Sequence, residues 1–298
     1  MARSKNLERS DAPRNSLLIM AEHFDFVRSH GLGNDYLVVD AGRLGFDLTP
    51  ERIRQICHRN TGVGSDGILA LVKPPAKVDF AVRILNPDGS EAEKSGNGLR
   101  IFAKFLHDHG YAKKNEFTIH TAGGVVRAKL ILERNRCVAV RVDMGRAVID
   151  RKLVKLDVDG QSLNVTSLSV GNPHCVTIVD DLSKVNLLKL GPLVENHRAF
   201  PNRTNVQFAQ VMSRHDVRAL IWERGAGHTL ASGSSSCAIA TACFDRGLVD
   251  SPVTIHMEGG DLTIEISKDL NLVMTGPVEE VCTGTFSPDL RKRLGLEK

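Results

Sequence analysis

Runs in which apolar and polar residues alternate recur along most of the chain. This period of two is typical of half-buried β-strands. Gly- and Asn-rich segments separate the runs, and residues 133–137 form a predicted hairpin turn between two of them. The pattern predicts strands at 23–27, 36–40, 68–72, 80–85, 117–121, 124–133, 137–143, 152–157, 162–170, 174–179, 204–211, 216–222, 252–257, 261–267 and 271–278.

Four segments have helical character instead. The first has Thr49 as its N-cap and Pro50 at the first helical position, and it extends to about Arg59. The other three lie near 96–109, 186–196 and 233–246. Many strands in hairpins with few helices predict an α+β fold in which each half is a sheet wrapped around one helix.

Two polar, Gly-rich loops look like copies of each other. Residues 86–100 contain Ser95-Gly and then an apolar run, and residues 223–237 contain Ser232-Gly and then another. The two serines are 137 residues apart, and a second matched pair, Gly33-Asn34 and Gly171-Asn172, is 138 apart. Two pairs at nearly one offset indicate a duplicated half.

Each loop has the design of an anion site. Serine is a preferred N-cap, and the glycine beside it lets a ligand approach the backbone. The first N–H groups of a helix lack internal partners, and the helix dipole makes that end positive. Two such ends facing one cleft would hold a carboxylate while negative charge develops beside it. A serine that is only a cap is the simpler alternative.

Bulk properties exclude several classes of function. The 298 residues suffice for about two domains, and the composition (42% hydrophobic, 25% charged) is typical of a globular protein. The net charge of +4 is spread along the chain and only 5% of residues are aromatic, so nucleic acid is not an expected partner. No apolar run approaches the roughly 18 residues that span a membrane.

The six cysteines form no C-x-x-C pair, so a zinc site is not expected. Residues 1–20 contain too short an apolar run for a secretion signal. Reduced thiols in the cytoplasm are the resulting interpretation. Residues 1–22 are predicted to be a disordered extension, and Met20 is an alternative start.

We expect an N-terminal domain at 23–146 and a C-terminal domain at 147–277. The last strand, about 278–290, is predicted to return to the first domain, so that the two domains exchange their ends.

Taken together, the motifs resemble those of the diaminopimelate epimerase family, cofactor-independent amino-acid epimerases and racemases. The similarity covers about residues 24–285. It implies two pseudo-symmetric domains, each a mostly antiparallel β-barrel around a central helix, with the active site in the cleft between them. The motifs are His30–Asp35, Asn86–Glu91, Gly96–Gly98, Gly171–His174, Pro201–Asn205 and Trp222–Gly227.

The resemblance implies interconversion of LL- and meso-diaminopimelate, a step toward lysine and peptidoglycan. In that family one cysteine thiolate removes the α-proton and a second thiol returns a proton to the opposite face, without pyridoxal phosphate or metal. A carbon acid this weak needs fixed dipoles to stabilise its carbanion and a base on each face. The resemblance also leaves room for a homodimer.

Several positions depart from the family pattern. Its two cysteines correspond to Ser95 and Ser232, a common glutamine to Gly67, and the usual acidic residue before Thr229 to His228. A thiol titrates near 8.5, whereas a serine hydroxyl needs an adjacent base. His228 is either a solvated loop residue or a replacement base for Ser232. Lys94 is expected to be exposed and Cys237 to be a buried packing residue.

The positions that hold the substrate agree better with the family. By resemblance, His174 would be the partner of Ser95 and Glu223 the partner of Ser232, which makes these four the catalytic candidates. Arg224 would bind the distal carboxylate, and Glu223, Asn86 and Asn205 the distal amine. The full set of binding candidates is Asn34, Asn86, Gly96, Asn97, Asn172, Asn205, Glu223, Arg224, Gly233 and Ser234.

Two other functions stay open at this point. A family member with altered chemistry would racemise another amino acid or dehydrate a hydroxy-amino acid. A homologue with weak or no turnover would bind the ligand only. Exchange of the α-proton with solvent, a keto or imino product, and binding without either would distinguish the three.

Overall fold

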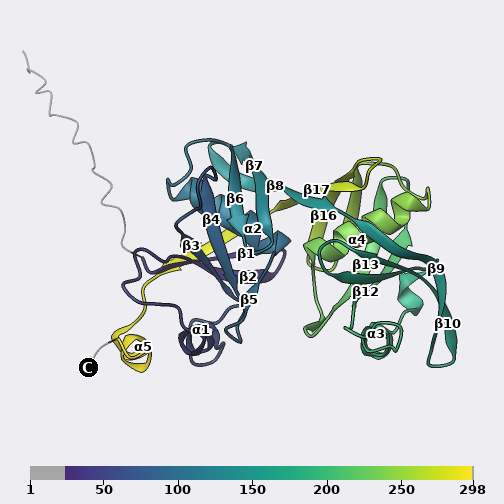
Figure 1. Ribbon diagram of the computed structural model, residues 1–298, viewed down its shortest axis with the longest axis horizontal. Coiled ribbons are helices and arrows are strands. Elements are labelled where there is room, and N and C mark those ends of the chain that lie inside the picture. Colours follow the sequence, from purple (N-terminus) through teal and green to yellow (C-terminus); the bar gives the residue numbers. More distant parts are fainter. Residues whose placement is uncertain (1–23, 297–298) are drawn as a thin grey trace, which may run out of the picture.

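The chain folds into two lobes that lie side by side (Figure 1). The computed structural model describes residues 24–296. The predicted extension at 1–22 and the alternative start at Met20 lie outside the described residues.

The first lobe contains most of the first half of the chain. Its helices are α1 (Pro50–Cys57) and α2 (Gly96–Asp108). Its strands are β1 (Phe26–Gly31), β2 (Asn34–Asp40), β3 (Ile68–Val72), β4 (Phe80–Leu85), β5 (Glu91–Ala92), β6 (Glu116–Thr121), β7 (Gly124–Glu133) and β8 (Arg136–Arg146).

The second lobe has helices α3 (Leu187–Glu195) and α4 (Gly233–Asp245) and a short 3₁₀ turn, η1 (Leu182–Lys184). Its strands are β9 (Val148–Val158), β10 (Gln161–Ser169), β11 (Pro173–Ile178), β12 (Asn205–Val211), β13 (Asp216–Glu223), β14 (Gly227–His228), β15 (Val253–Met257), β16 (Gly260–Ile266) and β17 (Asn271–Pro277). The chain ends with β18 (Glu279–Gly284) and α5 (Pro288–Arg293).

The two lobes repeat one pairing scheme. β1–β2 is antiparallel, β2–β3 parallel and β3–β4 antiparallel, and β10–β11, β11–β12 and β12–β13 follow the same order. β4 then pairs parallel with β6 as β13 does with β15, before a meander of two further strands. The α+β fold of two pseudo-symmetric halves is thus confirmed.

Two pairs of strands connect the lobes. β8 continues into β9 across the boundary, and β17 continues into β18 in the opposite direction (Figure 1). β8 and β17 pair antiparallel with each other, β9 pairs with β10, and β18 pairs with β1. The end of the chain therefore adds a strand to the first lobe, and the β8–β17 pair joins the sheets of the two lobes.

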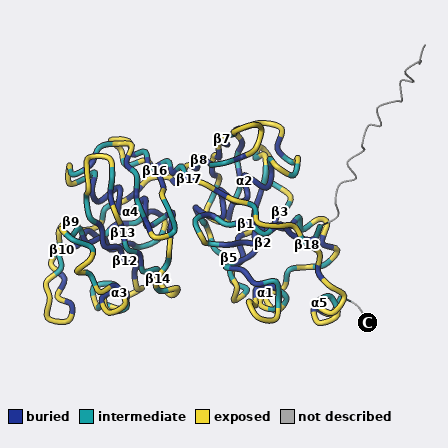
Figure 2. The backbone as a smooth tube through the Cα atoms, turned by 180° about the vertical axis from the view of Figure 1, so that it is seen from behind, coloured by how far each residue is buried: buried dark blue, intermediate teal, exposed yellow. Residues whose placement is uncertain are grey.

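One long helix lies inside each sheet. α2 packs against β1, β2, β7 and β8, and α4 packs against β10 to β13, β15 and β16. Both helices are dark in Figure 2, where exposed residues gather at the loops. From Gly96 to Leu106 every residue of α2 is buried, as expected of a helix surrounded by a sheet.

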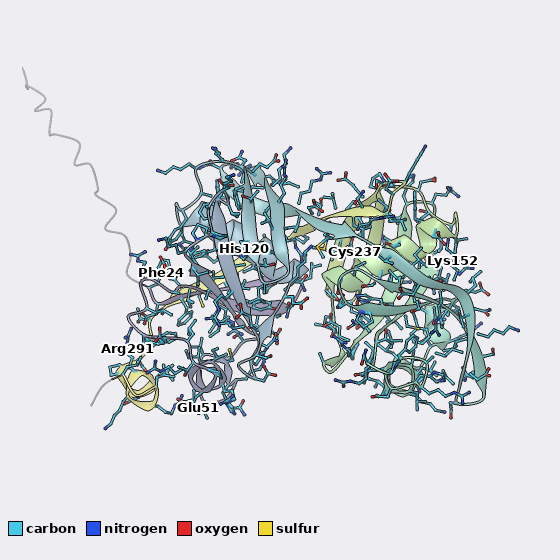
Figure 3. All side chains as sticks on the ribbon, viewed as in Figure 1. Phe24, Glu51, His120, Lys152, Cys237 and Arg291 are labelled. Atoms are coloured by element: carbon cyan, nitrogen blue, oxygen red, sulfur yellow. The ribbon has the colours of Figure 1, made fainter. Side chains whose placement is uncertain are left out.

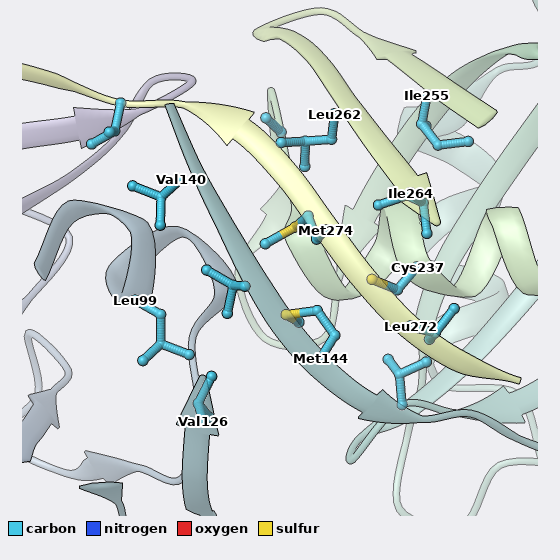
Figure 4. Close-up of a cluster of buried hydrophobic side chains, with 14 of the residues drawn as sticks. Leu99, Val126, Val140, Met144, Cys237, Ile255, Leu262, Ile264, Leu272 and Met274 are labelled. Atoms are coloured by element: carbon cyan, nitrogen blue, oxygen red, sulfur yellow. The ribbon is translucent and has the colours of Figure 1, made fainter. Parts of the chain in front are cut away.

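A hydrophobic core continues from one lobe into the other. Met144 on β8 and Met274 on β17 lie between Leu99 of α2 and Cys237 of α4 (Figure 4). Cys237 is fully buried, as expected, on the side of its lobe that faces the first lobe (Figure 3). Flexible methionine side chains fill this irregular junction.

Most predicted elements are present with small shifts of their ends. Thr49 caps α1 with Pro50 in its first turn, and the turn at 133–137 has positive φ at Arg134 and Asn135, which matches the twist of a hairpin. The pattern missed the two-residue strands β5 and β14, because two residues carry no periodicity. It also missed the short helix α5, and the last strand, predicted at about 278–290, ends at Gly284. The pattern also placed a loop where β1 and β2 join through Leu32 and Gly33 alone.

Candidate functional site

The N-termini of α2 and α4 meet between the lobes. A Cβ added to Gly233, the first residue of α4, would lie 3.5 Å from the Cα of Gly96, the first residue of α2. Met274 lies beside both glycines, and its sulfur would be 2.9 Å from that added Cβ. Only residues without side chains let the two helix ends come this close.

Both helices begin with a serine cap. The Ser95 hydroxyl accepts from the Gly98 N–H at 3.0 Å, and the Ser232 hydroxyl accepts from the Ser235 N–H at 3.4 Å. Within residues 24–296, the N–H groups of the first two residues of each helix have no hydrogen-bond partner. Four donors at two positive helix ends thus remain for an anion. They belong to Gly96, Asn97, Gly233 and Ser234.

Glu223 is the acidic group nearest to the cap of α4. The Thr229 hydroxyl donates to Glu223 Oε2 at 3.3 Å. Burial raises the pKa of Glu223 above its ordinary value, and Asp66 of the first lobe adds to this, while the nearby Ser232 and Thr229 hydroxyls oppose it. The carboxylate is therefore a stronger base than an exposed one. Ser232 itself is 3% exposed.

Ser95 has a different neighbour. The phenol oxygen of Tyr36, on β2, lies 3.4 Å from Ser95 Oγ. Tyr36 is 7% exposed, and burial raises its pKa, with Asp66, Glu223 and Asp35 contributing by their negative charge. The influence of Glu223 on Tyr36 also shows that the two lobes present their polar groups to each other.

His174 is fully buried on β11 and bonds within its own lobe. Its Nε2 lies 2.9 Å from Asn172 Oδ1, and its Nδ1 lies 2.9 Å from Gln207 Nε2. Burial lowers the pKa of His174 to about 3, and the positive charge of Arg224 acts in the same direction. The ring is therefore neutral. Its hydrogen-bonded partners are these two side chains, and Ser95 is not among them.

A chain of hydrogen bonds orients the asparagines at the end of α2. Asn34 donates to Asp66 at 2.9 Å and accepts from Asn97 at 3.2 Å. Asn97 in turn accepts from the guanidinium of Arg100 at 3.0 Å. Arg100 is completely buried, and burial lowers its pKa to about 10. The two amides are thus held in one orientation beside Gly96.

Of the remaining binding candidates, Asn205 and Arg224 lie near the end of β13 in the second lobe, and Asn86 follows β4 in the first lobe. The backbone N–H of Arg224 donates to Asn205 Oδ1 at 3.0 Å, and Asn205 Nδ2 donates to Pro173 O at 2.8 Å. Arg224 is exposed and donates to Asn202 O at 3.2 Å. Asn86 donates to Ser90 Oγ at 2.9 Å.

Two other residues form separate contacts. His228 is exposed and pairs with Glu258 in the β15–β16 turn. Lys94 is half-buried rather than exposed, donates to Asp143 O at 3.3 Å, and has a pKa lowered by burial. The hydrogen bonds of both side chains thus lead away from Ser232.

Sequence reasoning missed three residues of this region: Tyr36, Gln207 and Arg100. The signal for Tyr36 was available, because the 138-residue offset that pairs Asn34 with Asn172 also pairs Tyr36 with His174. Gln207 and Arg100 sit among apolar residues, and nothing in their spacing distinguishes them.

Within the described residues, no cluster of three or more His, Cys, Asp or Glu side chains is arranged to hold a metal ion. None of the helices in residues 24–296 is long and apolar enough to cross a membrane.

The sequence matches one known family over most of its length. The family model for diaminopimelate epimerase matches residues 26–149 and 166–281. The chain is 44% identical over 277 residues to diaminopimelate epimerase 2 of Nostoc sp., covering 89% of this chain and 96% of the relative. It is 42% identical to the diaminopimelate epimerase of Moorella thermoacetica over 279 residues, 89% of this chain and 99% of that one.

Two solved structures have a similar fold. A hydroxyproline epimerase from Agrobacterium vitis matches with a TM-score of 0.69 at 15% identity, covering 87% of this chain and 90% of that chain. A phenazine biosynthesis protein of the PhzF family from Bacillus anthracis also has a TM-score of 0.69, at 16% identity, covering 87% and 97%. At these identities the likeness concerns the fold alone.

Proposed function

The chain belongs to the diaminopimelate epimerase family, and we propose that it interconverts LL- and meso-diaminopimelate by moving the α-proton without a cofactor. The observation that carries this proposal is the meeting of two serine-capped helix ends at Gly96 and Gly233 with four free N–H groups. The reaction would serve the synthesis of lysine and peptidoglycan precursors.

The helix ends supply the stabilisation that the reaction needs. Removal of an α-proton leaves an electron pair that delocalises onto the neighbouring carboxylate, which then carries close to two negative charges. Backbone N–H groups fixed at two positive helix ends favour that charge and need no reorganisation during the step. The backbones of Gly96, Asn97, Gly233 and Ser234 would hold this α-carboxylate.

We assign the proton base on the second lobe's face to Glu223. Its raised pKa brings it closer to neutral pH, where a general base is most effective. Ser232 lies beside it and relays the proton, whereas Ser95 delivers a proton on the opposite face. His174, neutral and held by Asn172 and Gln207, is proposed to position Asn172 rather than to titrate.

The distal end of the substrate carries a second amine and a second carboxylate. Arg224, exposed at the end of β13, would bind that carboxylate in a charge-assisted hydrogen bond. The backbone N–H of Arg224 donates to Asn205 Oδ1 at 3.0 Å. This bond fixes the position of the backbone from which the Arg224 side chain extends. Asn86 and Glu223 lie at matching strand ends in the two lobes and would face the distal amine, with Asn34 oriented nearby.

We also propose the domain division at 146/147. The return of β18 to β1 supports joining the last strand to the first domain.

A homodimer is likewise a prediction, which light scattering on the purified chain would decide. A cytoplasmic location is proposed because all six cysteines are free, five of them buried.

The first experiment is proton NMR of LL- and meso-diaminopimelate with the purified protein in D₂O. We expect the α-proton signals to decay and the isomers to interconvert. No decay at high protein concentration would contradict the proposal. Binding detected by calorimetry without decay would indicate a binding protein.

A second candidate has one supporting observation. The two faces differ, because the Glu223 carboxylate lies beside Ser232 and the Tyr36 hydroxyl lies beside Ser95. One base on one face also suits the loss of a β-hydroxyl from a hydroxy-amino acid. Incubation with such amino acids and detection of a keto or imino product distinguishes dehydration from epimerisation.

A further inference from the structure

We propose that Tyr36 is the proton donor that works through Ser95 on the first lobe's face of the substrate. This inference rests on the proposed function, since it assigns the acid of that same reaction. It concerns a residue whose hydroxyl lies 3.4 Å from Ser95 Oγ and which the family resemblance did not bring into the site.

The bonding of Ser95 leaves a defined place for Tyr36. Ser95 Oγ already accepts from the Gly98 N–H at 3.0 Å, which leaves one lone pair and its own hydrogen. If the Tyr36 O–H donates to that lone pair, the Ser95 hydrogen is free to point toward the substrate. At 3.4 Å the contact is longer than a tight O–H···O bond, and such catalytic bonds often shorten when the substrate binds.

Gly67 makes room for the Tyr36 ring. A Cβ at position 67 would lie 2.8 Å from Cε1 of Tyr36 and 2.5 Å from the Leu85 carbonyl oxygen. Any larger residue would therefore displace the ring. Gly67 and the hydroxyl pair at Tyr36 and Ser95 thus belong to one packed region of the first lobe.

Internal symmetry separates Tyr36 from its counterpart. The offset of 138 places His174 in the second lobe where Tyr36 lies in the first. His174 uses both ring nitrogens on Asn172 and Gln207, whereas Tyr36 presents its hydroxyl to the serine cap of its own lobe. Only the first lobe thus connects this position to its serine.

The proposed step conserves protons and charge. Ser232 takes the α-proton as it gives its own hydrogen to the Glu223 carboxylate, and the electron pair of the broken C–H bond stays on the α-carbon and its carboxylate. The Ser95 O–H bond then breaks to protonate the opposite face, while Tyr36 gives its hydrogen to Ser95 and becomes a phenolate. Exchange with water returns Glu223 to carboxylate and Tyr36 to phenol.

Charge coupling favours this order of events. Burial raises the pKa of Tyr36, and the negative charges of Asp66, Glu223 and Asp35 raise it further, so Tyr36 is a phenol in the resting state. Once Glu223 is protonated, its negative charge disappears and phenolate formation costs less. Tyr36 thereby becomes a better acid only after the carbanion has formed.

Tyr36→Phe tests the proposal, with Tyr111→Phe as its matched control. The chain has only these two tyrosines, and the Tyr111 hydroxyl donates to Asp40 at 2.8 Å on a different part of the first lobe. We expect Tyr36→Phe to lower the inversion rate by roughly 10²-fold or more. Deuterium should still replace the α-proton of one isomer with retention of configuration, because Glu223 with Ser232 removes and returns that proton without Tyr36. Tyr111→Phe should leave both rates unchanged.

An independent readout follows the phenols directly. With ¹³Cζ-labelled tyrosine, two resonances report the two phenols, and Tyr36→Phe assigns them. We expect Ser95→Ala to raise the pKa of Tyr36, because the Ser95 contact lowers it, and to leave Tyr111 unmoved. A Tyr36 titration that does not respond to Ser95→Ala would overturn the pairing.

The outcomes separate this inference from the proposed function. Wild-type protein that fails to exchange any α-proton of diaminopimelate refutes both. Normal inversion by Tyr36→Phe in an active protein refutes only the role of Tyr36. Thermal unfolding of the variant confirms that a loss of inversion does not come from a loss of fold.

Discussion

The two serine-capped helices are built alike but are surrounded differently. α2 and α4 have 13 residues each and begin 137 positions apart, with Ser95 and Ser232 as caps. Beside Ser232 lies the carboxylate of Glu223, whereas beside Ser95 lies the phenol of Tyr36. The repeated fold determines where the two serine hydroxyls lie. The residues next to them determine which face of the site has a base.

This difference indicates a site with unequal faces. A carboxylate with a raised pKa accepts a proton readily, and a buried phenol gives one only when it is assisted. With a symmetric pair of thiols, matched substitutions in the two lobes would have similar effects. Here the two substitutions should have unequal effects, and exchange of the α-proton with retention should reveal that asymmetry.

Replacement of the carboxylate should have the largest effect. Glu223→Gln keeps the shape of the side chain and removes the base, so we expect inversion to fall roughly 10²- to 10⁴-fold. Deuterium incorporation with retention should disappear as well. The rate of the wild type should fall as the pH is lowered through the pKa of Glu223, which burial raises above that of an ordinary carboxyl group. Exchange that persists in the variant would assign the base to another group.

Arg224 is the residue that we propose for binding the distal carboxylate, and the offset of 137 places Pro87 at the matching position of the first lobe. A hydrogen bond to a charged group contributes about 1.5–3 kcal/mol, so Arg224→Ala should raise the Kd for diaminopimelate about 10- to 100-fold. Calorimetry measures this change. Arg198→Ala, at another exposed arginine of the second lobe, is the control, and equal losses in both variants would contradict a specific role.

His174 should make stability depend on pH. Its folded-state pKa of about 3 lies below the ordinary 6.5, so the unfolded chain binds the extra proton first. Stability contributed by keeping His174 neutral is present above pH 6.5 and falls between pH 6.5 and 3, by roughly 1.4 kcal/mol per pH unit.

Urea unfolding at pH 7.5 and pH 5 measures this effect. We expect the free energy of unfolding of the wild type to drop by about 2 kcal/mol more than that of His174→Gln. His120→Gln, on β6 of the first lobe, should behave as the wild type does. Identical pH dependence in His174→Gln and the wild type would show that the buried ring does not resist protonation.

Introduction of thiols should have the smallest and most informative effect. Ser95→Cys places a group that titrates near 8.5 on the face that lacks a carboxylate, and we expect about a tenfold rise in inversion. Ser232→Cys should gain less, because Glu223 already acts there, and the double variant should exceed both. Equal gains from the two single variants would mean that the faces are equivalent.

Periodicity, capping and repetition in the amino-acid sequence determined much of this protein. Alternating apolar residues are enough to locate strands, and Thr49-Pro50 or Ser95-Gly96 are enough to begin a helix, because these signals are local. The nearly constant offset also revealed the duplicated halves, and the motifs identified the family. Strands β5 and β14 escaped because two residues are too few to show a pattern.

Tertiary structure alone decided which side chains meet. Gly96 lies beside Gly233, and β18 pairs with β1, across separations of more than a hundred residues that no local pattern encodes. The burial that shifts the pKa values of Glu223 and His174 likewise arises from strands of several segments packed together. Desolvation depends on everything around a group, so the chemistry of the site follows from packing rather than from spacing.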